Sequence, residues 1–231
     1  MPAQVKRGAL FNNPRLPIKS PPEYPYAGDP FDRGDTPFPP VAGALGLTPV
    51  GKYQWLNLST DGVSPSYAAG GAIVGGRMGI TGQALPGTRR IATYFNAGIS
   101  DFRLALRLVS GVKDTTVGIA FRLLDMNNYL FMTIVANKWA LYKRVDGSGV
   151  QLYVPTNSFY ASDGDVVDVL CAGASVTPRV NGISMPTQTI NEFTTASRVG
   201  IVQTMPTGTT ATPLTLFDDA AVSRLGTWAE V

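Results

Sequence analysis

Histidine is absent from this chain of 231 residues, and glutamate and cysteine are almost absent. Without histidine there is no Ser-His or Cys-His pair, no imidazole metal ligand and no imidazole general base. The single cysteine, Cys171, leaves no internal disulfide and no cysteine zinc cluster. The only glutamates, Glu23, Glu192 and Glu230, are scattered, so paired glycosidase carboxylates would have to be aspartates. We therefore expect no catalytic residue, no cofactor and no metal site.

Charge and long apolar runs are also scarce. Charged residues make up 15% of the chain and the formal net charge is +3. No basic tract is long enough to follow a phosphate backbone, so we expect no nucleic-acid partner. No stretch approaches the roughly 18 apolar residues of a membrane span, and the N-terminus lacks a signal-peptide core, so we expect no membrane partner. Low charge suits a surface covered by neighbouring subunits, and a large sandwich core explains it equally.

Proline is concentrated at one end: ten of the 18 prolines fall in the first 40 residues, as in "NNPRLPIKSPPEYPYAGDPFDRGDTPFPP". Because proline fixes φ and lacks an amide donor, this stretch cannot enter a helix interior or a central strand. We interpret residues 1–49 as an extended anchoring arm, with a disordered tail as the alternative, and residues 50–231 as the folded domain. The residues expected to anchor the arm are Arg7, Phe11, Arg15, Lys19, Tyr24, Tyr26, Phe31 and Phe38.

The rest of the chain alternates apolar and polar residues with a period of two. In "FRLALRLV" (102–109) the residues Phe102, Leu104, Leu106 and Leu108 share one face, and in "VGIAFRLL" (117–124) we expect Val117, Ile119, Phe121 and Leu123 to point inward. Similar runs occupy 128–135, 138–145, 166–172, 175–180, 198–204 and 214–223, with turn dipeptides such as Asp146-Gly147 and Asn181-Gly182 between them. A helix over 99–111 is the alternative, but strict alternation favours a strand. The fold class predicted is all-β, an antiparallel two-sheet jelly-roll sandwich.

The order of these runs from about residue 90 resembles the concanavalin A-like lectin/glucanase jelly roll in its laminin-G-like form. The matching stretches are "FRLALRLV", "VGIAFRLLDMNNYLFMTIV", "WALYKRV", "SDGDVVDVLCAGASVTPRVNGISM" and "SRVGIVQT…LFDDAAVS". The resemblance implies two packed antiparallel sheets, of which the concave one binds sugars in relatives. The Glu-x-Asp-x-Glu strand of laminarinase-type relatives has no match here, so that hydrolase activity is not carried over.

Three aspartates cluster in "DGDVVDVLCAGASVTPRVNGISM" (163–185) and raise the alternatives of a metal site or an acid–base pair. We interpret Asp163-Gly164 as a turn and Asp165 as the start of a strand. With a tight turn at Ala172-Gly173, Asp168 would lie opposite Thr177 and diagonal to Arg179, close enough for a charge contact. The stretch therefore predicts a structural hairpin.

Other candidate sites are weaker. Asp218 and Asp219 suggest calcium, but adjacent strand residues point to opposite faces. Residues 70–82, "GGAIVGGRMGITG", lack the lysine of a phosphate loop and are interpreted as glycine-punctuated strands. Cys171 is expected to be a buried apolar residue. The candidate glycan-stacking residues are Tyr129, Tyr142, Tyr153 and Tyr160. We expect at most one of them to be more than half exposed, an outcome that favours a purely architectural sandwich over a glycan reader, and we expect Trp139 to face inward.

The long proline arm and the Gly/Thr/Ala-rich strands resemble minor tail and capsid-decoration proteins of tailed bacteriophages. Our leading hypothesis is that the chain is a non-enzymatic structural protein and that its location is the virion. Its expected partners are other virion proteins, copies of itself and a host glycan. The alternatives are a free carbohydrate-binding module and, less favoured, a glucanase-type hydrolase. A chain beginning near Val50 is expected to keep its thermal stability and to lose assembly.

Overall fold

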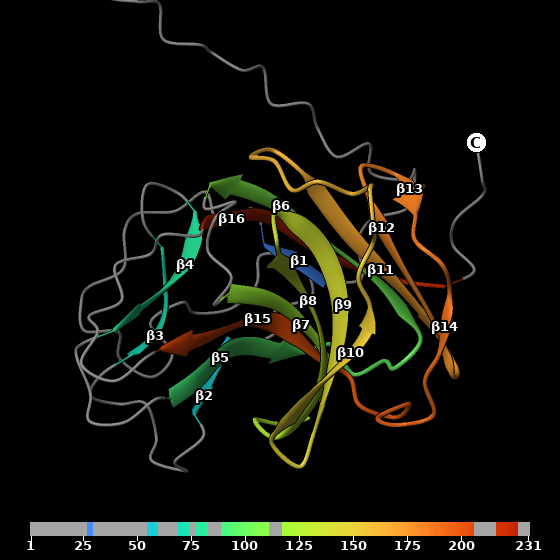
Figure 1. Cartoon of the computed structure of the whole chain (residues 1–231). Helices are drawn as coiled ribbons and strands as arrows, with labels where there is room; N and C mark the ends of the chain where they lie inside the picture. The colour runs from blue at the N-terminus through green and yellow to red at the C-terminus, as the bar shows by residue number, and fades with distance from the viewer. Residues whose placement is uncertain are drawn as a thin grey trace, which may run out of the picture.

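The structure is a computed structural model and describes residues 27–29, 55–59, 69–73, 77–82, 89–110, 117–205 and 216–225. Within these ranges every regular element is a strand, and the strands form two antiparallel sheets (Figure 1). The predicted all-β two-sheet jelly-roll sandwich is confirmed. Among the same residues no helix could cross a lipid bilayer.

One sheet contains nine of the described strands. Along it, in order, lie β13 (Ile183–Ser184), β12 (Ser175–Val180), β11 (Val166–Ala172), β6 (Phe102–Ser110), β16 (Leu216–Arg224), β4 (Met78–Gly82) and β3 (Ala69–Ile73). Two short strands are added to this order: β1 (Ala27–Asp29) pairs with β16, and β14 (Gln188–Thr189) pairs with β12. The glycine-punctuated strands expected over 70–82 are β3 and β4.

The other sheet contains seven strands. In order they are β10 (Ser148–Tyr153), β9 (Lys138–Val145), β8 (Asn128–Val135), β7 (Val117–Asp125), β15 (Arg198–Met205), β5 (Arg89–Asn96) and β2 (Leu56–Ser59). Strand β15 lies between β7 and β5, so a segment late in the chain completes the middle of this sheet.

The main core lies between the two sheets and follows the alternation of the sequence. On β6, Phe102, Leu104, Leu106 and Leu108 are fully buried in this core. On β9, Trp139 and Leu141 are buried in it as well, so the expected inward position of Trp139 is confirmed. The helical alternative for residues 99–111 is wrong, because 102–110 form a strand paired on both sides.

The inward position expected for Leu123 is wrong. Val117, Ile119 and Phe121 do face the main core, but the register of β7 with β8 shifts between Phe121 and Asp125. Arg122 has a φ of 48° at this irregularity. A backbone bulge of this kind breaks the period of two. Leu123 is therefore buried in a second apolar cluster instead of the main core.

The turns use residues that accept a left-handed backbone. Asp146 and Gly147 have φ angles of 48° and 81°, and Asn181 and Gly182 have 51° and 81°. Two consecutive positive φ angles are typical of type I′ hairpins, for which these dipeptides are the preferred sequences. The expected turns at these two sites are confirmed.

Of the predicted arm, the structure describes residues 27–29 alone. They form β1, in which Ala27 pairs with Val222 and Asp29 with Ala220. The eight candidate anchoring residues lie outside the described residues, so the role expected for them stays a prediction.

Candidate functional site

Asp165 is a buried structural carboxylate. Its oxygens accept hydrogen bonds from Trp139 Nε1 at 2.8 Å, from the Ser162 amide at 2.9 Å and from Asn181 Nδ2 at 2.8 Å. Its side chain thus ties β9 to both ends of the hairpin at residues 163–182. Asp163 is exposed in the turn, where Gly164 has a φ of 94°. The interpretation of this stretch as a structural hairpin is consistent with these contacts.

Asp168 holds two arginines on the outer face of the nine-stranded sheet. Its Oδ2 lies 2.7 Å from Arg103 Nη2, and its Oδ1 lies 3.8 Å from Arg179 Nε. The predicted turn at Ala172-Gly173 is wrong: Ala172 pairs with Ser175, so the turn residues are Gly173 and Ala174. This one-residue shift places Arg179, not Thr177, directly opposite Asp168. The predicted charge contact with Arg179 is present.

Asp218 and Asp219 make different contacts in β16. Asp218 Oδ1 accepts the amide hydrogen of Asp219, whereas Asp219 Oδ2 lies 3.1 Å from Arg107 Nε. No group of three acidic, histidine or cysteine side chains able to hold a metal occurs in the described ranges. Burial raises the pKa of the Cys171 thiol to about 12, in agreement with its expected place in the core.

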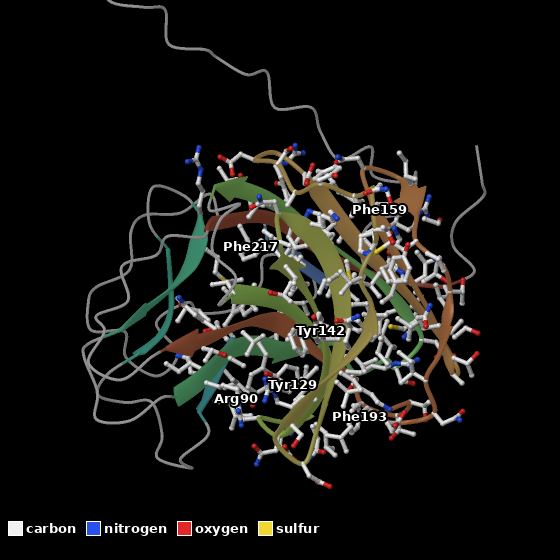
Figure 2. The ribbon with its side chains drawn as sticks, in the orientation of Figure 1. Arg90, Tyr129, Tyr142, Phe159, Phe193 and Phe217 are labelled. Atoms are coloured by element: carbon white, nitrogen blue, oxygen red, sulfur yellow. The ribbon has the colours of Figure 1, made fainter. Side chains whose placement is uncertain are left out.

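The structure separates the four candidate tyrosines. Tyr129 and Tyr142 lie together on the outer face of the seven-stranded sheet, on β8 and β9 (Figure 2). A register shift in β10 places Tyr153 opposite Leu141, and its ring packs on the main core. Tyr160 follows β10 and lies under the Lys138 ammonium, 5.4 Å from the ring centre. Tyr160, at 59% exposure, is the one of the four that is more than half exposed in the single chain.

Three rings form a continuous row on the outer face of the seven-stranded sheet. We call Tyr129, Phe131 and Tyr142 the aromatic row. The ring centres of Tyr129 and Phe131 are 5.3 Å apart, and those of Phe131 and Tyr142 are 5.6 Å apart, with the latter pair inclined by 30°. Tyr129 is buried, while Phe131 and Tyr142 are partly exposed. Contacts at these distances are typical of favourable aromatic pairs.

Hairpin geometry builds the aromatic row. A two-residue turn at Ala136-Asn137 joins β8 to β9, so Phe131 lies opposite Tyr142, and Tyr129 lies opposite Arg144. Directly opposed side chains on one face of an antiparallel pair are in contact range. The next strand adds Gln151 opposite Tyr142, and the Tyr142 hydroxyl donates to its Oε1 at 3.2 Å.

Arg144 is fixed above the aromatic row. Its Nε donates to the Tyr129 hydroxyl at 3.1 Å, and its Nη1 donates to the Gly147 carbonyl. Its guanidinium carbon lies 5.8 Å from the ring centre of Tyr129 and 6.0 Å from that of Phe131. A cation at this distance from an aromatic face is held by the ring quadrupole. Burial raises the pKa of the Tyr129 hydroxyl, and the charge of Arg144 partly offsets this rise.

A second apolar cluster includes Tyr129 of the aromatic row and packs against Phe131. It is separate from the main core and draws on β5, β7, β8 and β15. Its members are Ala92, Tyr94, Ala120, Leu123, Met126, Tyr129 and Val202, with Leu58 and Phe131 packed against it. The outer face of an antiparallel sheet is commonly polar. The members of this cluster are buried, and the partly exposed aromatic surface next to it is that of Phe131 and Tyr142.

Sequence reasoning found two members of this site and missed the others. Tyr129 and Tyr142 were candidates by residue type, whereas Phe131, Arg144 and Gln151 were not. The missing signal was the register: strands at 128–135 and 138–145 separated by two residues already oppose Phe131 to Tyr142.

Comparison with known proteins agrees with the fold. No family model matches the sequence, and no curated protein matches it. The structure of LamAcat from Zobellia galactanivorans is similar with a TM-score of 0.50 and 8% identity, over 85% of this chain and 96% of that one. Domain 4 of AbnA, a GH43 extracellular arabinanase from Geobacillus stearothermophilus solved with arabinotriose, has a TM-score of 0.46 and 13% identity, over 87% and 92%. The CBM2 module of the evolved Dit of Lactobacillus casei BL23 phage J-1 has a TM-score of 0.43 and 12% identity, over 68% and 80%.

These likenesses concern the fold. Together with the strand order, the similarity to LamAcat identifies a jelly-roll sandwich of the concanavalin A-like type. That part of the resemblance seen in the sequence is confirmed.

Proposed function

We propose that this chain is a non-enzymatic carbohydrate-binding protein and that sugars stack on its aromatic row. The observation that supports this most is the contact between partly exposed Phe131 and Tyr142 on the outer face of a sheet. A sugar ring presents a flat apolar face, and it binds where aromatic surface is flanked by a few fixed polar groups.

The polar groups that such a site needs lie beside the rings. The Gln151 side chain is exposed, and its Oε1 accepts a hydrogen bond from the Tyr142 hydroxyl. The NH₂ group of the same amide can therefore donate to a sugar hydroxyl. Arg144 offers a further donor at the other end of the aromatic row. The rings are positioned by strands, not by loops, so little side-chain order has to be gained on binding.

The aspartates near the hairpin favour binding over hydrolysis. Asp165 is engaged by three hydrogen-bond donors, and Asp168 is held by Arg103 at 2.7 Å. A general acid needs a carboxyl group that reaches the glycosidic oxygen, and neither side chain is exposed.

We further propose that the chain acts within the virion of a tailed bacteriophage, as a minor tail or capsid-decoration protein. In this proposal residues 1–49 attach it to other virion proteins or to further copies of itself, and the sandwich contacts a host glycan. The proline-rich composition and the unopposed basic residues of the first twenty positions support attachment to an acidic groove. A free carbohydrate-binding module has the same sandwich without this attachment.

Binding of a glycan panel by wild type and two ring variants tests the site. Phe131→Ala and Tyr142→Ala should each weaken binding about tenfold, because each removes a stacking surface worth about 1 kcal/mol or more. Tyr160→Ala removes a more exposed ring away from the aromatic row and should leave affinity unchanged. The oligosaccharides should be recovered intact by chromatography. Equal losses for all three variants, or turnover of any glycan, would contradict the proposal.

A further inference from the structure

Arg90 and Arg144 both lie at the turn containing Gly147, close to Tyr129. Arg90, on β5, donates from Nη2 to Asn127 Oδ1 at 3.0 Å, in the turn that joins β7 to β8. Arg144 lies over Tyr129 and Phe131. Burial lowers the pKa of Arg90, and the positive charge of Arg144 lowers it further. The two like charges are thus close enough to repel each other.

Arg144 carries no compensating carboxylate. Arg103, Arg107, Arg122 and Lys143 all lie within 4 Å of an acidic side chain, and in the described ranges Arg144 does not. Of the acids in the adjoining turns, Asp146 is exposed, and Asp125 is engaged within its own turn, where its oxygens accept from the Asn127 amide and from Asn128 Nδ2. Within the described ranges, the positive charge of the half-buried Arg144 thus has no ion-pair partner.

One edge of the Arg144 guanidinium is available to a ligand. Nε and Nη1 are used by the Tyr129 hydroxyl and the Gly147 carbonyl. Nη2 has no partner in the described part of the chain and is not among the buried polar atoms left without one, so it reaches solvent. The two used donors fix the orientation of the group, which is the arrangement that favours an oxyanion over a neutral hydroxyl.

We infer that the ligand of the aromatic row is an acidic saccharide whose carboxylate or sulfate binds Arg144 while the sugar ring stacks on Phe131 and Tyr142. The inference rests on the carbohydrate-binding function proposed above. It adds the chemical class of the ligand. Phe131 contacts Tyr142, and its ring centre is 6.0 Å from the Arg144 guanidinium, so a sugar unit at this ring can reach the neighbouring ring and the charge together.

Matched pairs of oligosaccharides test the charge without any mutation. Oligogalacturonate is compared with its methyl ester, and a sulfated galactan oligosaccharide with its desulfated form, by calorimetry on the full chain. At least one acidic member should bind about tenfold or more tightly than its neutral counterpart, and added salt should reduce the difference. Whether the carboxylate or the sulfate pair shows this effect identifies the acidic group.

Two variants locate the effect. Arg144→Gln should lose about tenfold more affinity for the acidic sugar than for its neutral counterpart, which loses a neutral hydrogen bond at most. Arg77→Gln removes the same charge from an exposed position before β4, in the other sheet, and should change neither affinity. If both variants lost the same affinity for the acidic sugar, the protein would attract it only through its overall positive charge. That result would overturn the inference.

The outcomes separate this inference from the function beneath it. Equal affinity for acidic and neutral sugars, still lost in Phe131→Ala, would overturn the acidic ligand and leave carbohydrate binding intact. Two outcomes would overturn both the acidic ligand and the carbohydrate-binding function. One is that polyglutamate binds as tightly as any glycan, and the other is that no glycan binds.

Discussion

The side chain of Asp165 shows how a single carboxylate can hold a hairpin in place. Asp165→Ala leaves the Trp139 indole N–H, the Ser162 amide and the Asn181 amide group without their acceptor. Because Asp165 is buried, we expect its loss to lower the free energy of unfolding by about 3 kcal/mol. Urea denaturation followed by tryptophan fluorescence measures this change.

Asp163→Ala is the matched control. Asp163 is an exposed aspartate two positions earlier, and its removal should change the free energy of unfolding by less than about 0.5 kcal/mol. Similar destabilisation by both substitutions would show that the hydrogen bonds of Asp165 do not support the hairpin.

For single residues, the sequence identified candidate residue types better than it identified the side chains that they contact. Tyr129 and Tyr142 were predicted as glycan-stacking residues because tyrosine joins an apolar ring to a hydroxyl. Arg144 was missed because an arginine in an alternating strand has no mark of its own, and its role depends on what lies opposite it. Residue type is local, whereas a site also depends on register.

Strands and turns were the best-predicted elements. The runs at 128–135, 138–145, 166–172 and 175–180 coincide with β8, β9, β11 and β12. Alternation predicts the face of each residue as long as the strand is regular. It failed at Leu123, where the irregularity at Arg122 moves the next side chain to the opposite face. A bulge is set by tertiary packing and leaves no clear pattern in the sequence.

The packing of β15 against β5 gives a prediction for the element. A methyl group added at Gly200 would lie 2.0 Å from the Thr93 carbonyl oxygen and 2.6 Å from the Tyr94 Cα. Both are backbone atoms of the adjacent strand, so β15 would have to move away. We expect Gly200→Ala to lower the free energy of unfolding by about 3 kcal/mol or more and to lower the melting temperature.

Gly149→Ala provides the comparison for that substitution. A methyl group at Gly149, on the exposed edge strand β10, would lie no closer than 3.7 Å to another group. It should change stability by less than about 0.5 kcal/mol in the same thermal melt. If Gly200→Ala melts like Gly149→Ala, the two strands are not as close as described.

For the whole molecule, the pairing of β1 with β16 affects where the chain can be shortened. The sequence predicts unchanged thermal stability for a chain beginning near Val50, but such a chain loses β1. Because β1 pairs with β16, we expect this chain to be about 2 kcal/mol less stable than a chain beginning at Ala27. Both should lose the self-association expected of the full chain, because both lack the candidate anchoring residues up to and including Tyr26. Thermal melts measure the first effect and light scattering the second. Undiminished association of the chain that begins at Ala27 would contradict anchoring by residues 1–26.

The position of the last two long strands has a consequence for synthesis on the ribosome. Strand β15 fills the place between β5 and β7, and β16 pairs with β6, more than one hundred residues earlier in the sequence. Neither sheet can close until these segments have left the exit tunnel, so the edges of β5, β6 and β7 that they cover stay open while the intervening residues are made. Pairing across such a separation folds slowly and exposes strand edges that can pair with other chains. The nascent protein is therefore most prone to aggregation just before its last strands emerge.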